Sequence, residues 1–107
     1  MKNAEFSWQG QRKQKVYAQE WLPEEEPRAA VALVHGLGEH TGRYQHVAAH
    51  FTRAGYALIG ADLPGHGKTE GPRGVSSYEE MLAEIDCLLE SAGERFPGAP
   101  LFLYGHS

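Results

Sequence analysis

Three short apolar runs, each followed closely by glycine, constrain the fold of this chain more than any other feature. The runs lie at 29–34, 56–61 and 101–104. A short apolar run that does not alternate with polar residues is typical of a strand covered on both faces. Two earlier segments, at 5–9 and 15–22, have weaker strand character. The sequence therefore predicts a strand at each of these places.

The segments between the runs have the spacing of helices. Apolar residues recur at helical intervals from Tyr44 onward, and Gly55 is the expected stop. A longer stripe covers 78–92, with Ser77 and Glu80 as a capping box at its start and Gly93 and Pro97 closing its far end. Because helices separate buried strands, the sequence predicts an α/β fold with a mostly parallel central sheet flanked by helices.

Composition and charge exclude several classes of protein. The 107 residues carry a formal net charge of −4 and no block of lysine or arginine, so neither nucleic acid nor an anionic membrane is an expected partner. No apolar run approaches the ~20 residues of a transmembrane segment, and the polar stretch 1–15 does not resemble a secretory signal. The single cysteine, Cys87, fits a reducing compartment. We expect a cytoplasmic location.

The first candidate site follows the run at 29–34. His35, Gly36, Leu37 and Gly38 form an H-G-x-G sequence. Acyl transfer needs N–H donors aimed at the developing oxyanion, and glycine lets the backbone approach closely. Loops of this type supply one such donor in esterases and lipases, so the Leu37 N–H is the candidate donor. The alternative is a glycine-rich strand-to-helix turn with no further role.

The second candidate is the turn-rich stretch 62–69. Its end, Gly-Lys-Thr at 67–69, imitates a phosphate-binding loop, but Asp62 stands where that motif requires glycine. A dinucleotide-binding fingerprint in the preceding loop fails in the same way, because Thr41 replaces its third glycine. We interpret the stretch as a structural turn beside a site, in which Asp62 and His66 fix the loops.

The third candidate lies at the end of the chain. The run at 101–104 leads into Gly105-His106-Ser107, which is the first half of the G-x-S-x-G nucleophile elbow. In that elbow a strand turns sharply and holds a serine Oγ exposed above the sheet. The alternative is an ordinary serine that caps a turn or a helix.

The remaining histidine and cysteine side chains give weaker signals. His46 and His50 have the spacing of a metal-binding pair on a helix, but no third ligand is evident. We therefore expect exposed histidines and no metal. His40 lies in the glycine-rich loop and is a candidate for a backbone hydrogen bond. Cys87 falls between apolar helix positions and is expected to pack there.

In their order along the chain, these motifs resemble the α/β-hydrolase superfamily, and most closely its monoacylglycerol lipase and lysophospholipase group. The stretches 34–44, 62–71 and 96–107 carry the resemblance. It implies a serine hydrolase without a cofactor, in which Ser107 attacks an ester carbonyl to form an acyl-enzyme. The oxyanion donors would be the N–H groups of Leu37 and of the residue after Ser107. The residues implied to support the oxyanion loop and the elbow are His35, Gly36, Gly38, Gly105 and His106.

The resemblance also implies that the catalytic Asp and His follow the nucleophile in chain order. Residues 1–107 would then be the N-terminal portion of a single hydrolase domain, inactive alone. A continuation of the chain or a second polypeptide would supply both groups. Without later strands, 101–104 would be an exposed apolar edge.

The implied substrates are monoacylglycerols, lysophospholipids or short acyl esters. A hydrolase-like binding protein without a working triad, or a truncated fragment, is the alternative. Peptidase, thioesterase and cofactor-free peroxidase activities stay open, because one fold hosts many activities.

Overall fold

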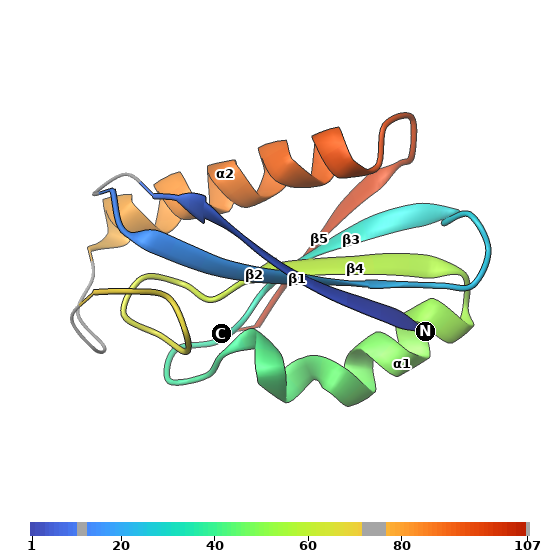
Figure 1. The fold of residues 1–107 in the computed structure, drawn as a ribbon, viewed down its shortest axis with the longest axis horizontal. Helices are drawn as coiled ribbons and strands as arrows, with labels where there is room; N and C mark the ends of the chain where they lie inside the picture. The colour runs from blue at the N-terminus through green and yellow to red at the C-terminus, as the bar shows by residue number, and fades with distance from the viewer. Residues whose placement is uncertain (11–12, 72–76, 107) are drawn as a thin grey trace.

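The computed structural model describes residues 1–10, 13–71 and 77–106, and it confirms the α/β class (Figure 1). Within these residues, one sheet contains the strands in the order β1-β2-β4-β3-β5. The strands are β1 (Lys2–Gln9), β2 (Lys15–Leu22), β3 (Ala29–Val34), β4 (Tyr56–Ala61) and β5 (Leu101–Gly105). The helices are the 3-10 helix η1 (Thr41–Tyr44), α1 (Gln45–Arg53) and α2 (Tyr78–Arg95).

The first strand is longer than its sequence pattern predicts. β1 begins at Lys2 rather than at Glu5, because it pairs antiparallel with β2 along its whole length, from Lys2 opposite Leu22 to Gln9 opposite Lys15. Pairing with a neighbouring strand holds these polar residues in an extended conformation that their own propensity does not favour.

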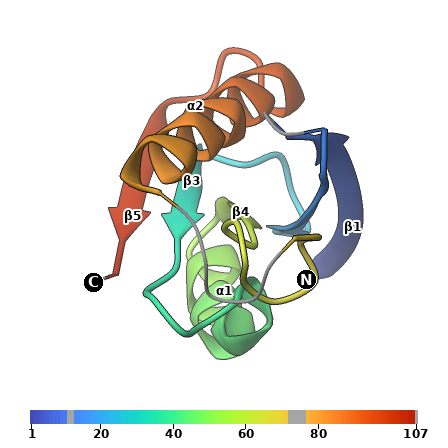
Figure 2. The same ribbon diagram turned by 90° about the vertical axis from the view of Figure 1, so that its left-hand side faces the viewer.

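β3 is the strand on which the arrangement of the sheet depends. It pairs in parallel with β4 on one side and β5 on the other, with Ala32 opposite both Ile59 and Leu103. The connection from β3 through α1 to β4 therefore runs toward one edge of the sheet, and the connection from β4 through α2 to β5 runs back toward the other edge. Because such crossovers are right-handed, the reversal places α1 and α2 on opposite faces, as Figures 1 and 2 show. The carboxyl ends of β3 and β5 thus flank a topological switch point, where open α/β sheets bind ligands.

Each face of the sheet has its own apolar core. One cluster joins Ala32 and Ile59 of the sheet to Leu88 of α2, and the other joins Leu33 to Ala48 of α1. Successive residues of β3 thus enter opposite clusters, so this strand is buried on both faces, as its continuous apolar sequence predicts.

The second helix continues past Gly93 and ends at Arg95, before Pro97. α2 runs through Gly93, because the Phe96 N–H still donates a hydrogen bond to the Ala92 carbonyl (3.0 Å). The chain turns away at Gly98, where φ is +81°. A left-handed backbone conformation favours glycine at that position, whereas Gly93 is accommodated inside the helix.

Two apolar surfaces are exposed. Near the start of α2, Tyr78 is 73% exposed and Leu82 is also exposed, so the predicted stripe is buried only farther along the helix. On β5, which lies at the edge of the sheet, Phe102 is 59% exposed, and the other residues of the strand are exposed too. The predicted exposed apolar edge at 101–104 is confirmed.

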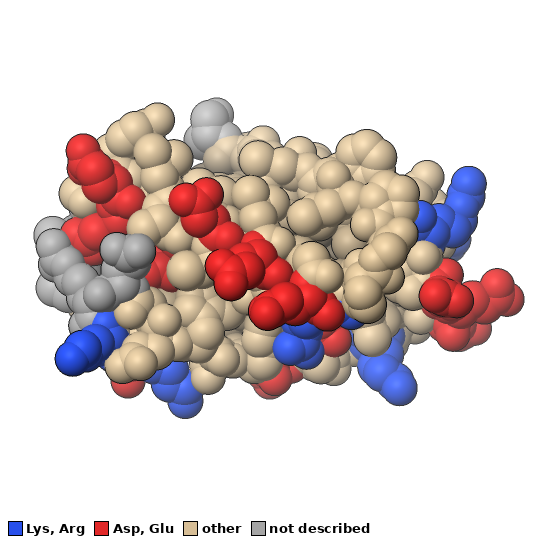
Figure 3. Space-filling model, turned by 90° about the horizontal axis from the view of Figure 1, so that it is seen from above, with Lys and Arg blue, Asp and Glu red and all other residues tan. Residues whose placement is uncertain are grey.

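Acidic side chains run along the outer face of α2, which Figure 3 views from above. Four exposed residues have the spacing that aligns them on one side of a helix: Glu79, Asp86, Glu90 and Glu94. Their negative charge disfavours contact between this face and an anionic surface. In the part of the chain that the structure describes, no helix has both the length and the apolar character of a membrane span.

Leu33→Ala should lower the free energy of unfolding by about 2–5 kcal/mol, because truncating a fully buried leucine leaves a cavity between the sheet and α1. Leu37→Ala is the matched control: this leucine is 74% exposed, and the change should be below about 0.5 kcal/mol. Urea unfolding of both variants and the parent measures the difference. Equal stabilities would contradict the central position of β3.

Candidate active site

Parallel pairing brings two of the three sequence motifs together. Gly105 pairs with Val34 in the β3–β5 register, and the His106 N–H donates to the Val34 carbonyl (3.0 Å). The end of β5 therefore lies beside the loop that contains Leu37 (Figure 2). Ser107, the predicted nucleophile, is the next residue and lies outside the described residues.

The H-G-x-G sequence folds into a tight turn. The Glu39 N–H donates to the Gly36 carbonyl (3.1 Å), and Gly38 has a φ of +79°, which together define a type II turn. That φ explains the need for glycine at position 38. None of the described residues accepts a hydrogen bond from the Leu37 N–H. The turn therefore leaves one backbone donor available, at the position predicted for the oxyanion donor.

His35 fixes the direction of that donor. Its Nε2 accepts a hydrogen bond from the Leu63 N–H (2.9 Å), so the ring proton is on Nδ1, which donates to the Gly36 carbonyl (2.8 Å). Because a trans peptide is planar, holding the Gly36 C=O on one side directs the Leu37 N–H to the other. The His35 ring is buried, and burial lowers its pKa, which favours the neutral form that this arrangement requires.

A buried carboxylate joins the loop after β3 to the loop after β4. Asp62 Oδ1 accepts from the Thr41 N–H (2.8 Å) and the Thr41 hydroxyl (2.7 Å), and Oδ2 accepts from the Lys68 N–H (2.9 Å). Gln19 Nε2 donates to the Thr41 hydroxyl (2.8 Å). His66 Nδ1 lies 2.9 Å from the Pro64 carbonyl, within the same loop. Asp62 and His66 therefore fix the loops, as the sequence predicts.

Sequence reasoning missed Glu39. Its Oε1 accepts from the Gly36 N–H (2.8 Å) and the Tyr44 hydroxyl (2.7 Å) and lies 3.1 Å from His106 Nδ1. The Tyr44 and Gly36 hydrogen bonds, followed by His106, lower the pKa of Glu39 to about 2. The available sequence signal was spacing: a carboxylate three residues after a glycine N–H can fold back onto it, as in a capping box.

The other candidate side chains lie apart from this site. His40 Nδ1 accepts from the Gly42 N–H (3.1 Å), as expected of a backbone partner. His46 and His50 are exposed on α1. Among the described residues, no three His, Cys, Asp or Glu side chains are arranged to hold a metal ion. Cys87 is half-buried, and burial raises the pKa of its thiol.

For Gly105 the described residues offer no steric reason for glycine. Apart from Gly105 and its two chain neighbours, none of those residues has a heavy atom within 4 Å of the position that a Cβ would take. The steric requirement that the resemblance implies at the elbow therefore stays a prediction.

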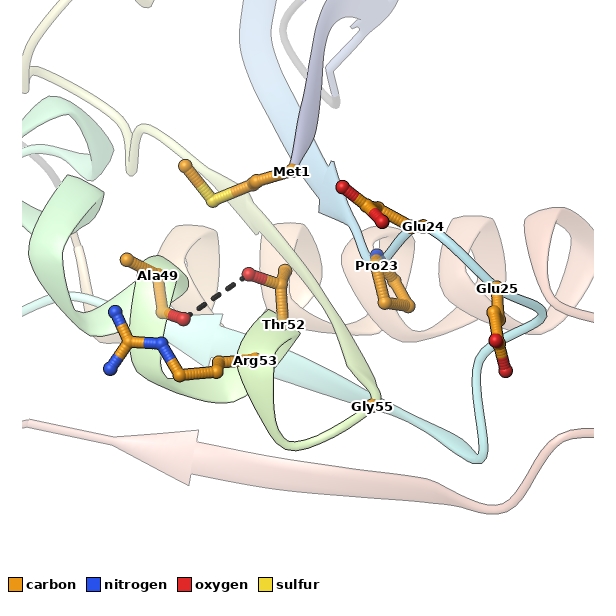
Figure 4. Close-up of a pocket in the computed structure, with 8 residues that line it drawn as sticks. All are labelled: Met1, Pro23, Glu24, Glu25, Ala49, Thr52, Arg53 and Gly55. Atoms are coloured by element: carbon orange, nitrogen blue, oxygen red, sulfur yellow. Dashed lines mark hydrogen bonds between the residues drawn. The ribbon is translucent and has the colours of Figure 1, made fainter.

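Figure 4 shows the residues that line a cavity of about 490 Å³. Its lining includes Met1 and Gly55, which directly precede β1 and β4, Pro23, which follows β2, and Ala49 of α1. The Leu37 turn follows the carboxyl end of β3 instead, so this cavity is separate from the candidate active site.

Comparisons with known proteins identify the family. The family model described as serine aminopeptidase, S33 (Hydrolase_4) matches residues 25–107. The chain is an α/β-hydrolase of this family. The monoacylglycerol lipase of Mycolicibacterium smegmatis is 38% identical over 88 residues, which cover 81% of the chain and 31% of that lipase. The human monoglyceride lipase is 34% identical over 95 residues, which cover 88% of the chain and 31% of that lipase.

A solved structure agrees with this assignment. A thermostable carboxyl esterase from Bacillus coagulans has a TM-score of 0.87 and 34% identity, and the match covers 99% of the chain and 36% of the esterase. The resemblance to α/β-hydrolases of the monoacylglycerol lipase type is thus confirmed. This hydrolase chain spans about a third of the length of the lipases it matches. The roles of Leu37, His106 and Ser107 stay predictions.

The hydrolase should lose stability as the pH falls below 6.5, the ordinary pKa of histidine. Because the pKa of His35 is lower in the folded state, the unfolded chain binds a proton first, and the free energy of unfolding falls until the folded pKa is passed. Urea unfolding between pH ~8 and ~5 measures the slope. His35→Gln retains a donor and an acceptor but does not titrate, so it should remove this part of the slope. An identical slope in the variant would contradict the assignment.

Proposed function

We propose that this α/β-hydrolase cleaves carboxylic esters through an acyl-enzyme on Ser107, with the Leu37 N–H as one of two oxyanion donors. The proposal rests on the Leu37 N–H, a donor that no described residue uses and whose peptide plane is held by His35. The similarity to lipases and a carboxyl esterase supports the ester class.

The reaction takes two steps. Ser107 Oγ attacks the ester carbonyl carbon and gives its proton to a general base, while the carbonyl oxygen becomes an oxyanion that accepts from the Leu37 N–H. Collapse of this intermediate breaks the ester C–O bond, and the leaving alcohol takes the proton from the base. Water then attacks the acyl-serine with help from the same base, releases the carboxylic acid and restores the Ser107 hydroxyl.

The general base is proposed to come from outside residues 1–107. His35 uses both ring nitrogens within the loop, and His66 Nδ1 bonds the Pro64 carbonyl. We therefore infer that 1–107 is the N-terminal portion of one hydrolase domain, inactive alone. The catalytic Asp and His would come from a continuation of the chain or from a second polypeptide. The exposed apolar β5 supports this inference, since an edge of this kind is stable when further structure covers it.

Monoacylglycerols, lysophospholipids and short acyl esters are the proposed substrates. The names of the relatives support them: monoacylglycerol lipases, and a phospholipase, YtpA, of Bacillus subtilis that is 37% identical over 82 residues. A cytoplasmic location is proposed from the single cysteine. The alternative is a hydrolase-like binding protein without a working triad. The next experiment distinguishes this alternative from an active esterase.

In the complete domain, Ser107→Ala should lower kcat for a monoacylglycerol by about 10⁴-fold or more, because the acyl-enzyme cannot form. It should also abolish labelling by a fluorophosphonate probe, which intact-mass spectrometry detects as one adduct. Ser7→Ala, at an exposed serine on β1, is the matched control and should keep both properties. A complete parent protein that neither turns over esters nor takes up the probe would favour the binding protein. Residues 1–107 alone should remain unlabelled.

Leu37→Pro should lower kcat by about 10²–10³-fold with little change in KM, because it deletes one oxyanion N–H. Proline suits the second position of a type II turn, so the backbone should keep its shape. Leu37→Ala keeps the N–H and should retain most of the activity. Steady-state kinetics of the two variants would contradict the donor assignment if both lost activity equally.

A further inference from the structure

Glu39 links the Leu37 turn to the end of β5. One oxygen of its carboxylate, Oε1, contacts three groups from separate parts of the chain. The Gly36 N–H belongs to the turn, the Tyr44 hydroxyl ends the 3-10 helix, and His106 Nδ1 directly precedes the predicted nucleophile. A single side chain therefore touches both segments that the proposed reaction requires.

This contact begins where the backbone ladder stops. The His106 N–H still bonds the Val34 carbonyl, which aligns the ends of β3 and β5. Neither His35 nor His106 belongs to a strand, so beyond this bond main-chain pairing no longer sets the distance between the turn and His106. At that point the Glu39–His106 contact of 3.1 Å connects the turn to the end of β5. It is a hydrogen bond when Nδ1 of His106 carries the proton.

The charge of Glu39 argues for a geometric role. An anion beside a developing oxyanion raises the energy of the transition state through Coulomb repulsion. The donors that converge on Oε1 offset part of this repulsion, and the Tyr44 and Gly36 hydrogen bonds, the largest causes of its low pKa, extend its ionisation to more acidic pH. Since the charge itself opposes the chemistry, Glu39 contributes by holding the groups that it contacts.

We infer that Glu39 is a positioning residue that keeps the oxyanion loop and the nucleophile elbow in register, acting through Gly36 and His106. This inference rests on the proposed function. A positioning defect should reduce kcat rather than substrate binding, since the misplaced groups act on the reacting carbonyl and not on the rest of the substrate.

In the complete domain, Glu39→Ala should lower kcat for a monoacylglycerol by about 10- to 100-fold and leave KM within about twofold. Glu39→Gln keeps an acceptor oxygen in the same place and should recover most of the loss. Glu24→Ala is the matched control: it removes an exposed carboxylate at the opposite end of the sheet and should leave kcat unchanged. A kcat of folded Glu39→Ala within about twofold of the parent would overturn the inference.

A second variant keeps the test valid if Glu39→Ala unfolds. His106→Ala removes the contact to the elbow but leaves the Gly36 and Tyr44 hydrogen bonds of Glu39, so it should reproduce the kcat loss without a loss of stability. A kcat of His106→Ala within about twofold of the parent would overturn the inference. Where Glu39→Ala folds, combining it with His106→Ala should lower kcat no further than Glu39→Ala alone, whereas a multiplied loss would show that the two residues act independently and would also overturn it. Fluorophosphonate labelling of the parent reports separately on the proposed function. A parent without label or turnover would overturn that function, and the role of Glu39 with it.

Discussion

The parallel pairing of β3 with a strand on each side is the constraint on which the rest of this structure depends. It commits both edges of β3 to main-chain hydrogen bonds and both faces to apolar contacts, which explains the uninterrupted apolar sequence of that strand. The connections on the two sides of β3 run in opposite directions. Among the described elements, this gives one topological switch point, between the carboxyl ends of β3 and β5. Any chemistry at this edge must therefore be built from the residues that follow these two strands.

Side-chain hydrogen bonds, rather than main-chain pairing between strands, hold those residues in place. His35 is neutral and directs a peptide plane, Asp62 joins two loops in the interior, and Glu39 joins the turn to the elbow from a partly exposed position. Each uses backbone N–H groups as partners, so the loops are fixed by hydrogen bonds that exist before a substrate arrives. Donors held in this way need no reorganisation when an oxyanion forms, which is the main source of their catalytic effect.

The sequence was informative where the local pattern of residue types is enough to predict a structure. Apolar continuity predicted β3 and β4, and the order of the motifs predicted the family. It was less informative where a partner distant in the chain decides. Lys2 is extended because Leu22 pairs with it, and Glu39 gains its contact with His106 only when β5 comes to lie beside β3. None of these partners can be read from a local window of residues.

The two halves of the candidate site differ in what holds them. The oxyanion half is fixed by contacts among residues 35–69, with Leu63, Asp62 and Thr41 bonded to one another or to the turn. The elbow half follows β5, which is hydrogen-bonded to β3 along one edge and is exposed along its whole length. A strand held on one side can shift relative to its neighbour at its end, where the ladder stops. The contact between Glu39 and His106 joins these two halves at that end, which supports the positioning role proposed for Glu39 despite its charge.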